Sequence, residues 1–225
     1  MRTRIKICGI REPEHARIAA EAGADAIGLV FAEISPRRIT LDEARRVIAA
    51  LPTFVEPIGL FVDSEPEKVR TMCLELGIRT AQLHGSESVE QVESLAPLRV
   101  VKAISFENPQ AAGAALDQWR SVASISGLLF DAPKAGAIGQ PTGGTGRTLD
   151  WSTLAGAIDG AGRATLPPTL LAGGLHPENV ATAIQTVRPW AVDVSSGVEV
   201  QRGIKDPDRI AAFCHHVRAA DASAG

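Results

Sequence analysis

The stretch from residue 26 to residue 62 reads AIGLVFAEISPRRITLDEARRVIAALPTFVEPIGLFV, and it decides the fold class. Its two ends, Ala26–Phe31 and Glu56–Val62, are apolar runs of the length of a buried strand. Between them, Thr40 and Glu43 form a capping box that marks the start of a helix. The apolar residues that follow share one helical face: Leu41, Ala44, Val47, Ile48 and Leu51. A strand, a helix and a second strand in this order predict a parallel β-α-β unit.

The same alternation occupies almost the whole chain. Further strand-length runs are predicted at Arg4–Gly9, Thr80–His84, Arg99–Ser105, Gly127–Ala132, Thr169–Gly173 and Ala191–Ser195. With the two runs above, these make eight units in 225 residues, which predicts a (β/α)8 TIM barrel. We expect residues 1–225 to form a single domain, with residues 219–225 as a frayed tail. A doubly wound open sheet is the alternative, but no Gly-x-Gly-x-x-Gly follows the first strand, where a dinucleotide-binding fold would have it.

The composition argues against several classes of function. A net charge of −3 supplies no basic surface for a nucleic acid or an anionic membrane. No apolar run reaches the roughly 18 residues of a membrane helix. The N-terminal residues lack the roughly 7–15-residue apolar core of a signal peptide, so we expect a cytoplasmic protein. The three cysteines lack metal-ligand spacing, so we expect neither a disulfide framework nor a zinc site.

Polar residues occupy the inward-facing parity of the predicted strands. These positions hold Lys6, Cys8, Gln82, His84, Asp131, Asp193 and Ser195. Burying a polar group without a partner costs about 1–3 kcal/mol, so several such groups together indicate a site. The alternative is a structural network in which they satisfy one another, and it carries more weight for Lys6, Gln82 and Asp193 taken singly. Cys8, His84 and Asp131 end their strands, where catalytic residues of a TIM barrel lie.

Three glycine-rich segments are candidate anion sites: Gly143–Arg147, Ala172–Gly174 and Ser195–Gly197. The last two follow the seventh and eighth strands, whose loops bind phosphate in many barrels through backbone N–H groups. The segment Pro133–Thr142 is rich in glycine and proline, and it is interpreted either as a mobile lid or as a passive surface insertion. Arg37, in a loop after the second strand, belongs either to a solvated turn or to a fork that binds a carboxylate.

Six motifs, in order between about residue 4 and residue 215, together resemble the phosphoribosylanthranilate isomerase family. They are Lys6-Ile7-Cys8-Gly9-Ile10, Ser35-Pro36-Arg37, Gln82-Leu83-His84-Gly85, Gly143-Gly144-Thr145-Gly146, Ala172-Gly173-Gly174-Leu175 with Pro177-Glu178-Asn179, and Asp193-Val194-Ser195-Ser196-Gly197-Val198-Glu199. That family supplies the isomerisation step between anthranilate and indole in tryptophan synthesis. The resemblance implies a TIM barrel and a cofactor-free Amadori rearrangement.

The resemblance also implies roles for individual residues. Cys8 would be the general base and Asp131 the general acid. Arg37 would hold the anthranilate carboxylate, and His84 would contact the substrate. The phosphate would bind the backbone of Gly144, Gly174, Ser196 and Gly197. The family often has an aromatic residue after the second strand, where this chain reads Phe31-Ala32-Glu33-Ile34.

The chemistry of this rearrangement suits these residue types. Ring opening needs an acid at the ring oxygen, and the resulting Schiff base needs a base at C2′. A nearby cation such as Lys6 is expected to raise the thiolate fraction of Cys8. An aspartic acid at a partly dry barrel mouth is expected to retain a proton that it can donate. Because the iminium is an electron sink within the substrate, we expect neither a metal nor a nicotinamide cofactor.

Two other classes remain as alternatives. One is a different phosphosugar barrel enzyme: an epimerase, a histidine-pathway isomerase or a flavin-phosphate barrel. The other is a non-catalytic phosphosugar-binding module, which has no reason to place a thiol and a carboxylate on inward-facing strand ends. In either case we expect a small phosphosugar ligand, no nucleic-acid or membrane partner, and a monomer or a homodimer.

Overall fold

The structure is a computed structural model that describes residues 2–132 and 150–223. Eight parallel strands pair in sequence order, and β8 pairs with β1, so that the sheet closes into a barrel. The strands are β1 (Arg4–Cys8), β2 (Ala26–Val30), β3 (Glu56–Phe61), β4 (Thr80–Leu83), β5 (Arg99–Ser105), β6 (Ile125–Asp131), β7 (Thr169–Leu171) and β8 (Ala191–Val194). The predicted TIM barrel is therefore confirmed, and the open-sheet alternative is wrong.

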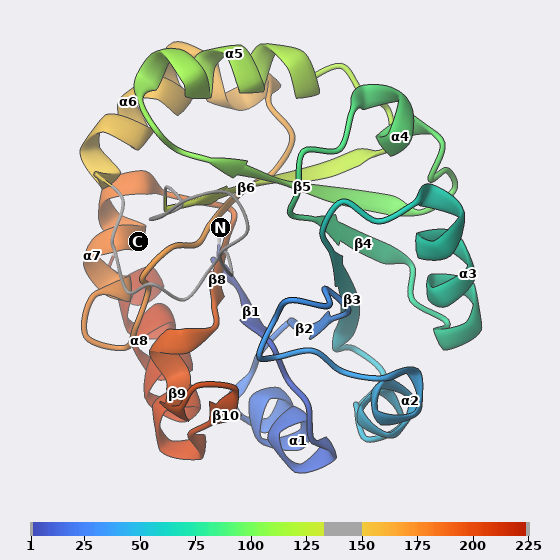
Figure 1. Cartoon of the computed structure of the whole chain (residues 1–225). Coiled ribbons are helices and arrows are strands. Elements are labelled where there is room, and N and C mark those ends of the chain that lie inside the picture. Colours follow the sequence, from blue (N-terminus) through green and yellow to red (C-terminus); the bar gives the residue numbers. More distant parts are fainter. Residues whose placement is uncertain (1, 133–149, 224–225) are drawn as a thin grey trace.

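Helices form an outer ring around the strands (Figure 1). They are α1 (Pro13–Ala22), α2 (Leu41–Ala49), α3 (Pro66–Leu76), α4 (Val89–Glu93), α5 (Pro109–Trp119), α6 (Trp151–Gly160), α7 (Val180–Val187) and α8 (Pro207–Ser223). The capping box predicted at α2 is present, with Thr40 and Glu43 each bonding the other's backbone N–H. In the described part of the chain, no helix is long and apolar enough to cross a membrane.

The C-terminal residues differ from the prediction. Helix α8 continues to Ser223, so residues 219–223 are helical rather than frayed. Ala220 is buried, and Asp221 accepts hydrogen bonds from the backbone N–H and the hydroxyl of Thr3, both at 2.7 Å. A buried apolar contact and a charge-assisted pair of hydrogen bonds therefore hold this turn against the barrel.

The hydrophobic core lies between the barrel and its helices. Ile5 and Ile7, predicted to face the helices, are 2% and 0% exposed within it. The alternate positions point into the barrel, where Lys6 and Asp193 meet. One departure from simple strand–helix alternation positions the site: after β8 the chain forms a short antiparallel pair, β9 (Glu199–Gln201) and β10 (Ile204–Lys205), before α8 begins (Figure 1).

Candidate active site

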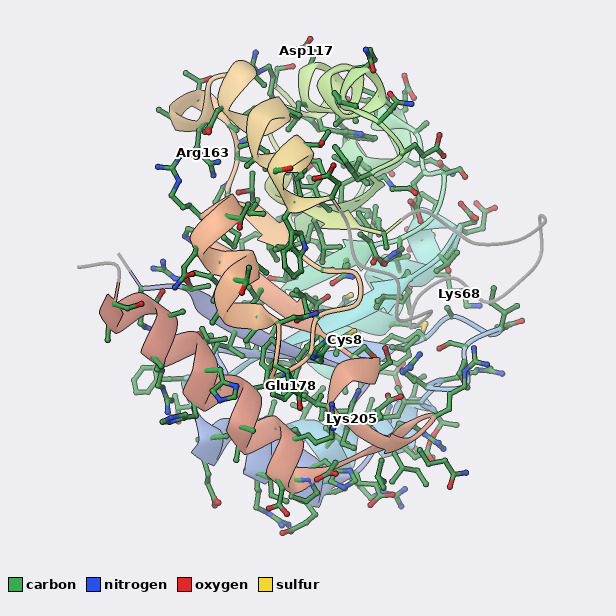
Figure 2. All side chains as sticks on the ribbon, turned by 90° about the vertical axis from the view of Figure 1, so that its left-hand side faces the viewer. Cys8, Lys68, Asp117, Arg163, Glu178 and Lys205 are labelled. Atoms are coloured by element: carbon green, nitrogen blue, oxygen red, sulfur yellow. The ribbon has the colours of Figure 1, made fainter. Side chains whose placement is uncertain are left out.

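A pocket opens at the carboxyl ends of the barrel strands. It collects most of the predicted site residues, namely Cys8, Arg37, His84, Asp131, Gly174 and Ser196. Cys8 lies in the interior of the molecule, whereas Asp117 on α5 lies at its outer edge (Figure 2). Residues from β1, the loop after β2, β4, β6, β7 and β8 therefore converge on one space, as expected for the catalytic face of this fold.

Cys8 is the last residue of β1, and it is 5% exposed. Gly28 of β2 is its partner in the strand register. A Cβ atom at Gly28 would lie 2.7 Å from Cys8 Sγ and 3.1 Å from Lys6 Nζ. The missing side chain of Gly28 thus provides the space that the thiol occupies.

A buried ion pair lies beneath the thiol. Lys6 Nζ donates to Asp193 Oδ1 at 2.8 Å, and both side chains are almost fully buried. Burial alone would lower the pKa of Lys6, but the Asp193 carboxylate and the Cys8 thiol raise it above its ordinary value. Burial raises the pKa of Cys8 by more than the Lys6 charge lowers it. Lys6 lowers the pKa of the Cys8 thiol, as expected. Because burial raises this pKa by more, Cys8 is more protonated than an exposed cysteine.

The thiol should respond in opposite senses to the two members of this pair. We expect Lys6→Met to move the Cys8 titration midpoint to higher pH, because a positive charge that favours the thiolate is lost. We expect Asp193→Asn to move it to lower pH, because a negative charge that disfavours the thiolate is lost. Ultraviolet thiolate absorbance, measured against the same variants carrying Cys8→Ala, gives the midpoint. Shifts of the same sign would show that packing changes, rather than these charges, control the thiol.

Asp131 ends β6, and its carboxylate lies beside His84, which directly follows β4. His84 Nε2 is 3.2 Å from Asp131 Oδ2, and each side chain is 17% exposed. Asp131 Oδ1 accepts the backbone N–H of Ala132 at 2.8 Å. A Cβ atom at Gly173 would lie 3.0 Å from Asp131 Oδ1 and 2.5 Å from the Ala132 nitrogen, so the glycine lets the loop after β7 approach this carboxylate closely. An acidic group and an imidazole therefore lie together at the pocket wall.

Arg37 lies at the pocket with part of its guanidinium already bound. Its Nε and Nη2 donate to the two carboxylate oxygens of Glu199 at 2.7 and 2.8 Å, and the side chain is 8% exposed. Lys205 Nζ donates to Glu199 Oε1 at 2.9 Å and to the Ser195 carbonyl oxygen at 2.9 Å. Burial opposes ionisation of Glu199, but Arg37 and Lys205 together hold its pKa below the ordinary value. Nη1 takes no part in the Glu199 pair.

Of the residues predicted to bind phosphate in the two late glycine-rich loops, some line the pocket and one does not. Gly173 and Gly174 have φ of +80° and +65°, which favours glycine, and both line the pocket together with Ser196. Gly197 is absent from the pocket lining, and a Cβ atom there would lie 1.9 Å from the carbonyl oxygen of Leu175. Its glycine therefore allows close backbone packing behind the pocket. Gly144 and the segment 133–142, with its lid interpretation, lie outside the described residues.

An aliphatic surface forms the opposite wall. Val30, Ala32, Ile34, Leu60 and Val62 line the pocket beside Cys8. The nearby aromatic residue, Phe31, instead stacks on Phe61 in the outer core with a centroid distance of 5.3 Å. An aromatic ring of a ligand would thus lie against aliphatic side chains in this protein.

Four residues of the site were not predicted from the sequence: Gly28, Glu199, Arg202 and Lys205. Arg202 lines the pocket, and Lys205 is 2% exposed although lysine is seldom buried without a partner. Glu199 ends one of the quoted motifs but received no role. The available signal was a cluster of charged residues directly after the eighth strand. Within residues 2–132 and 150–223, no group of three or more His, Cys, Asp or Glu side chains is arranged to hold a metal ion.

Comparisons with known proteins agree with this geometry. The model of a family described as N-(5'phosphoribosyl)anthranilate (PRA) isomerase matches residues 5–216. The N-(5'-phosphoribosyl)anthranilate isomerase of Halorhodospira halophila is 44% identical over 222 residues, which are 98% of this chain and 99% of that protein. The Moorella thermoacetica isomerase is also 44% identical, over 97% of this chain and 91% of that protein.

Solved structures show the same relationship. The phosphoribosyl anthranilate isomerase of Thermotoga maritima superposes with a TM-score of 0.84 at 39% identity, and the match covers 96% of this chain and 99% of that one. A phosphoribosyl anthranilate isomerase in complex with reduced 1-(o-carboxyphenylamino)-1-deoxyribulose 5-phosphate superposes with a TM-score of 0.82 at 38% identity, with the same coverage. The barrel, its pocket and these matches over nearly the full length together show that the chain belongs to the N-(5'-phosphoribosyl)anthranilate isomerase family.

Proposed function

We propose that this protein converts N-(5'-phosphoribosyl)anthranilate to 1-(2-carboxyphenylamino)-1-deoxyribulose 5-phosphate, with Cys8 as the general base and Asp131 as the general acid. The observation that carries the assignment of roles is the position of a thiol and a carboxylate at the ends of β1 and β6, facing one pocket. The same pocket offers a guanidinium for a carboxylate and glycine-rich loops for a phosphate. We place the enzyme in the cytoplasm, in the synthesis of tryptophan.

The proposed reaction consists of ring opening followed by proton transfers within the open-chain substrate. Asp131 gives a proton to the ring oxygen as the C1′–O bond breaks and the anthranilate nitrogen forms a C=N bond to C1′. The Cys8 thiolate then takes the proton from C2′, and the electrons of that C–H bond neutralise the iminium to give an enolamine. In the tautomerisation of the enolamine, the C2′ hydroxyl loses its proton and C1′ gains one, which leaves the ketone at C2′. The iminium is the electron sink for removal of the C2′ proton.

Two anchors orient the substrate between base and acid. Arg37 Nη1 binds the anthranilate carboxylate, and the backbone of Gly174 and Ser196 binds the phosphate at the far end. Gly144 lies outside the described residues and stays a predicted phosphate ligand, whereas Gly197 supports its loop from behind the pocket. Fixing both ends of the substrate holds C2′ near Cys8 and the ring oxygen near Asp131, which lowers the entropic cost of reaching the reactive geometry.

An assay with freshly formed phosphoribosylanthranilate tests the proposal directly. Its fluorescence should disappear at an enzyme-dependent rate, and the aminoketose should accumulate in equal amount. A protein that binds a phosphosugar but leaves this fluorescence unchanged would be a different barrel enzyme or a binding module. A yellow purified protein would indicate a flavin instead.

The carboxylate anchor predicts a contrast between adjacent arginines. Arg37→Ala should raise KM about 10–100-fold, because a hydrogen bond to a charged group contributes about 1.5–3 kcal/mol. Arg38→Ala should change KM little, since Arg38 is exposed and lies outside the pocket lining. Steady-state kinetics of both variants, with melting curves to check the fold, make the comparison. Equal KM values in the two variants would remove Arg37 from the carboxylate site.

The assembly state is a separate part of the proposal. A monomer and a homodimer both suit a site built from one chain, because every residue assigned above comes from a single barrel. One structural relative is described as a dimeric isomerase from which monomers were generated. Sedimentation velocity across a range of concentrations distinguishes the two states for this protein.

A further inference from the structure

The side chain of Gln82 is joined to the acid through His84. Gln82 and His84 are two positions apart at the end of β4, so both point into the barrel. Gln82 Nε2 lies 3.3 Å from His84 Nδ1, and His84 Nε2 lies 3.2 Å from Asp131 Oδ2. The three side chains form a line of contacts that ends at the carboxylate assigned to donate the proton.

Gln82 is the buried end of this line. The residue is 1% exposed, and its register partners are Leu60 on β3 and Val101 on β5. Its Oε1 atom is buried without a hydrogen-bond partner among the described residues. A buried carbonyl oxygen without a partner costs about as much free energy as a lost hydrogen bond. Rotation of the Gln82 amide would offer this oxygen to His84.

The two orientations of the amide have different consequences for the acid. With Nε2 toward His84, the imidazole Nδ1 must accept, so a neutral His84 carries its hydrogen on Nε2 and donates it to an ionised Asp131. That arrangement stabilises the carboxylate and leaves Asp131 with no proton to deliver. Rotating the amide by 180° directs Oε1 at Nδ1, which must then carry the hydrogen. The Nε2 lone pair of a neutral His84 then faces Asp131 and favours its protonated form.

We propose that Gln82 is a positioning residue for the acid of this reaction: its carbonyl oxygen accepts Nδ1–H of His84 and holds the tautomer in which the proton for delivery lies between His84 Nε2 and Asp131. The inference rests on the proposed function of Asp131 as the acid. In this tautomer the Nε2 lone pair of His84 gives the acid a partner for its proton. When the shared proton leaves, the His84 lone pair and the Asp131 charge repel each other, and this repulsion favours its return.

Other charged groups also line or underlie this pocket and contribute to its potential. They are Cys8 and Lys6 on β1, Arg37 and Arg202 in the loops, and Asp193 on β8. None of them has a hydrogen bond to His84 among the described residues. Their influence is present equally in variants that change Gln82 alone, so comparing such variants isolates the effect of the amide.

Histidine-selective ¹⁵N NMR of the substrate-free protein reads the tautomer directly. The chain has five histidines, and the His84 signals are identified by their loss in His84→Asn. In the unsubstituted protein, we expect a protonated Nδ1 and a non-protonated Nε2 once the pair has lost its shared proton. In Gln82→Met, which offers no amide, we expect the Nε2–H tautomer to predominate. The titration midpoint of the pair should then fall by about one pH unit, as expected for the loss of one hydrogen bond.

Gln82→Glu is the conservative test, because its carboxylate keeps an acceptor at the same place. It should restore the Nδ1–H tautomer and move the titration midpoint to higher pH than in the unsubstituted protein, since an added negative charge favours the protonated pair. The pH at which kcat falls on the alkaline side should move in the same directions in the two variants. A merely structural role for Gln82 would change stability in both variants without opposite shifts.

Leu170→Val is a matched packing control. Leu170 is buried on β7 among the aliphatic side chains of the barrel interior, and its register partners are Leu129 and Ala191. This variant should lose stability and keep the His84 tautomer. An Nε2–H tautomer in the unsubstituted protein, or the same tautomer and midpoint in Gln82→Met and Gln82→Glu, would overturn the inference. Because the NMR measurement needs no substrate, a protein without isomerase activity that still showed the Gln82-dependent tautomer would refute only the proposed function.

Discussion

Cys8→Ala is expected to lower kcat by about 10²–10⁴-fold, the usual contribution of one general acid or base. The variant removes the thiol of Cys8 from the pocket lining but leaves the proposed Arg37 anchor and the late glycine loops in place. KM and the affinity for a phosphate-bearing product analogue should therefore change little. Cys8→Ser should also be a poor enzyme, because a neutral hydroxyl is a much weaker proton acceptor than a thiolate. Turnover at saturating substrate is the decisive measurement.

The two other cysteines supply matched controls. Cys73 on α3 and Cys214 on α8 are fully buried in the outer core. Burial raises the pKa of Cys73 to about 12 and that of Cys214 to about 11, so both thiols are protonated at neutral pH. Cys73→Ala and Cys214→Ala should lower the melting temperature and preserve kcat. Turnover near the unsubstituted value in Cys8→Ala would remove the proposed mechanism, even with the barrel and phosphate site intact.

Asp131→Asn is expected to lower kcat by a similar factor, about 10²–10⁴-fold, because an amide cannot deliver the proton that opens the ring. The substitution keeps the shape of the side chain and an oxygen that can accept the Ala132 N–H. Binding should therefore persist while turnover is lost. Pre-steady-state mixing with substrate should show binding without ring opening.

Asp117→Asn is the control for this change. Asp117 lies on α5 at the outer edge of the molecule, and its side chain is 73% exposed (Figure 2). Its loss should leave kcat unaltered. A fully active Asp131→Asn enzyme would assign the acid to another group, and His84 beside it would be the first to substitute.

The barrel was predictable from the sequence because its signals are local. Strand parity placed Ile5 and Ile7 against the helices and Lys6 inside, and each position is confirmed. A capping box and apolar helical spacing identified α2. The ends of the strands were harder to predict. Strand β7 ends at Leu171 rather than at Gly173, because Gly173 and Gly174 turn the chain with positive φ.

The partners within the site were less predictable because they depend on contacts between distant residues. The resemblance to the family predicts Arg37 as a carboxylate ligand, but the ion pair of Arg37 with Glu199 joins residues 162 positions apart. No local sequence pattern shows which carboxylate forms an ion pair with a given arginine. Lys6 lowers the pKa of Cys8, as expected, but burial raises that pKa by more. The burial of the thiol depends on the packing of the whole barrel and is not encoded in one segment of sequence. In the sequence Gly28 is an ordinary strand residue, and only its position beside the thiol of Cys8 shows why a larger side chain does not fit there.

The contact between Lys6 and Asp193 has a consequence for how the protein is made. It joins residues 187 positions apart, so the strand that carries the proposed base leaves the ribosome well before its ionic partner. The Ser195 hydroxyl likewise donates to the Cys8 carbonyl oxygen at 3.1 Å across the same seam. Contacts of such long sequence separation form late, because the chain must lose the entropy of closing the loop before the contacts can stabilise it. Closure of the barrel between β8 and β1 therefore also completes the surroundings of the proposed base, and a nascent chain without β8 lacks the ionic partner of Lys6.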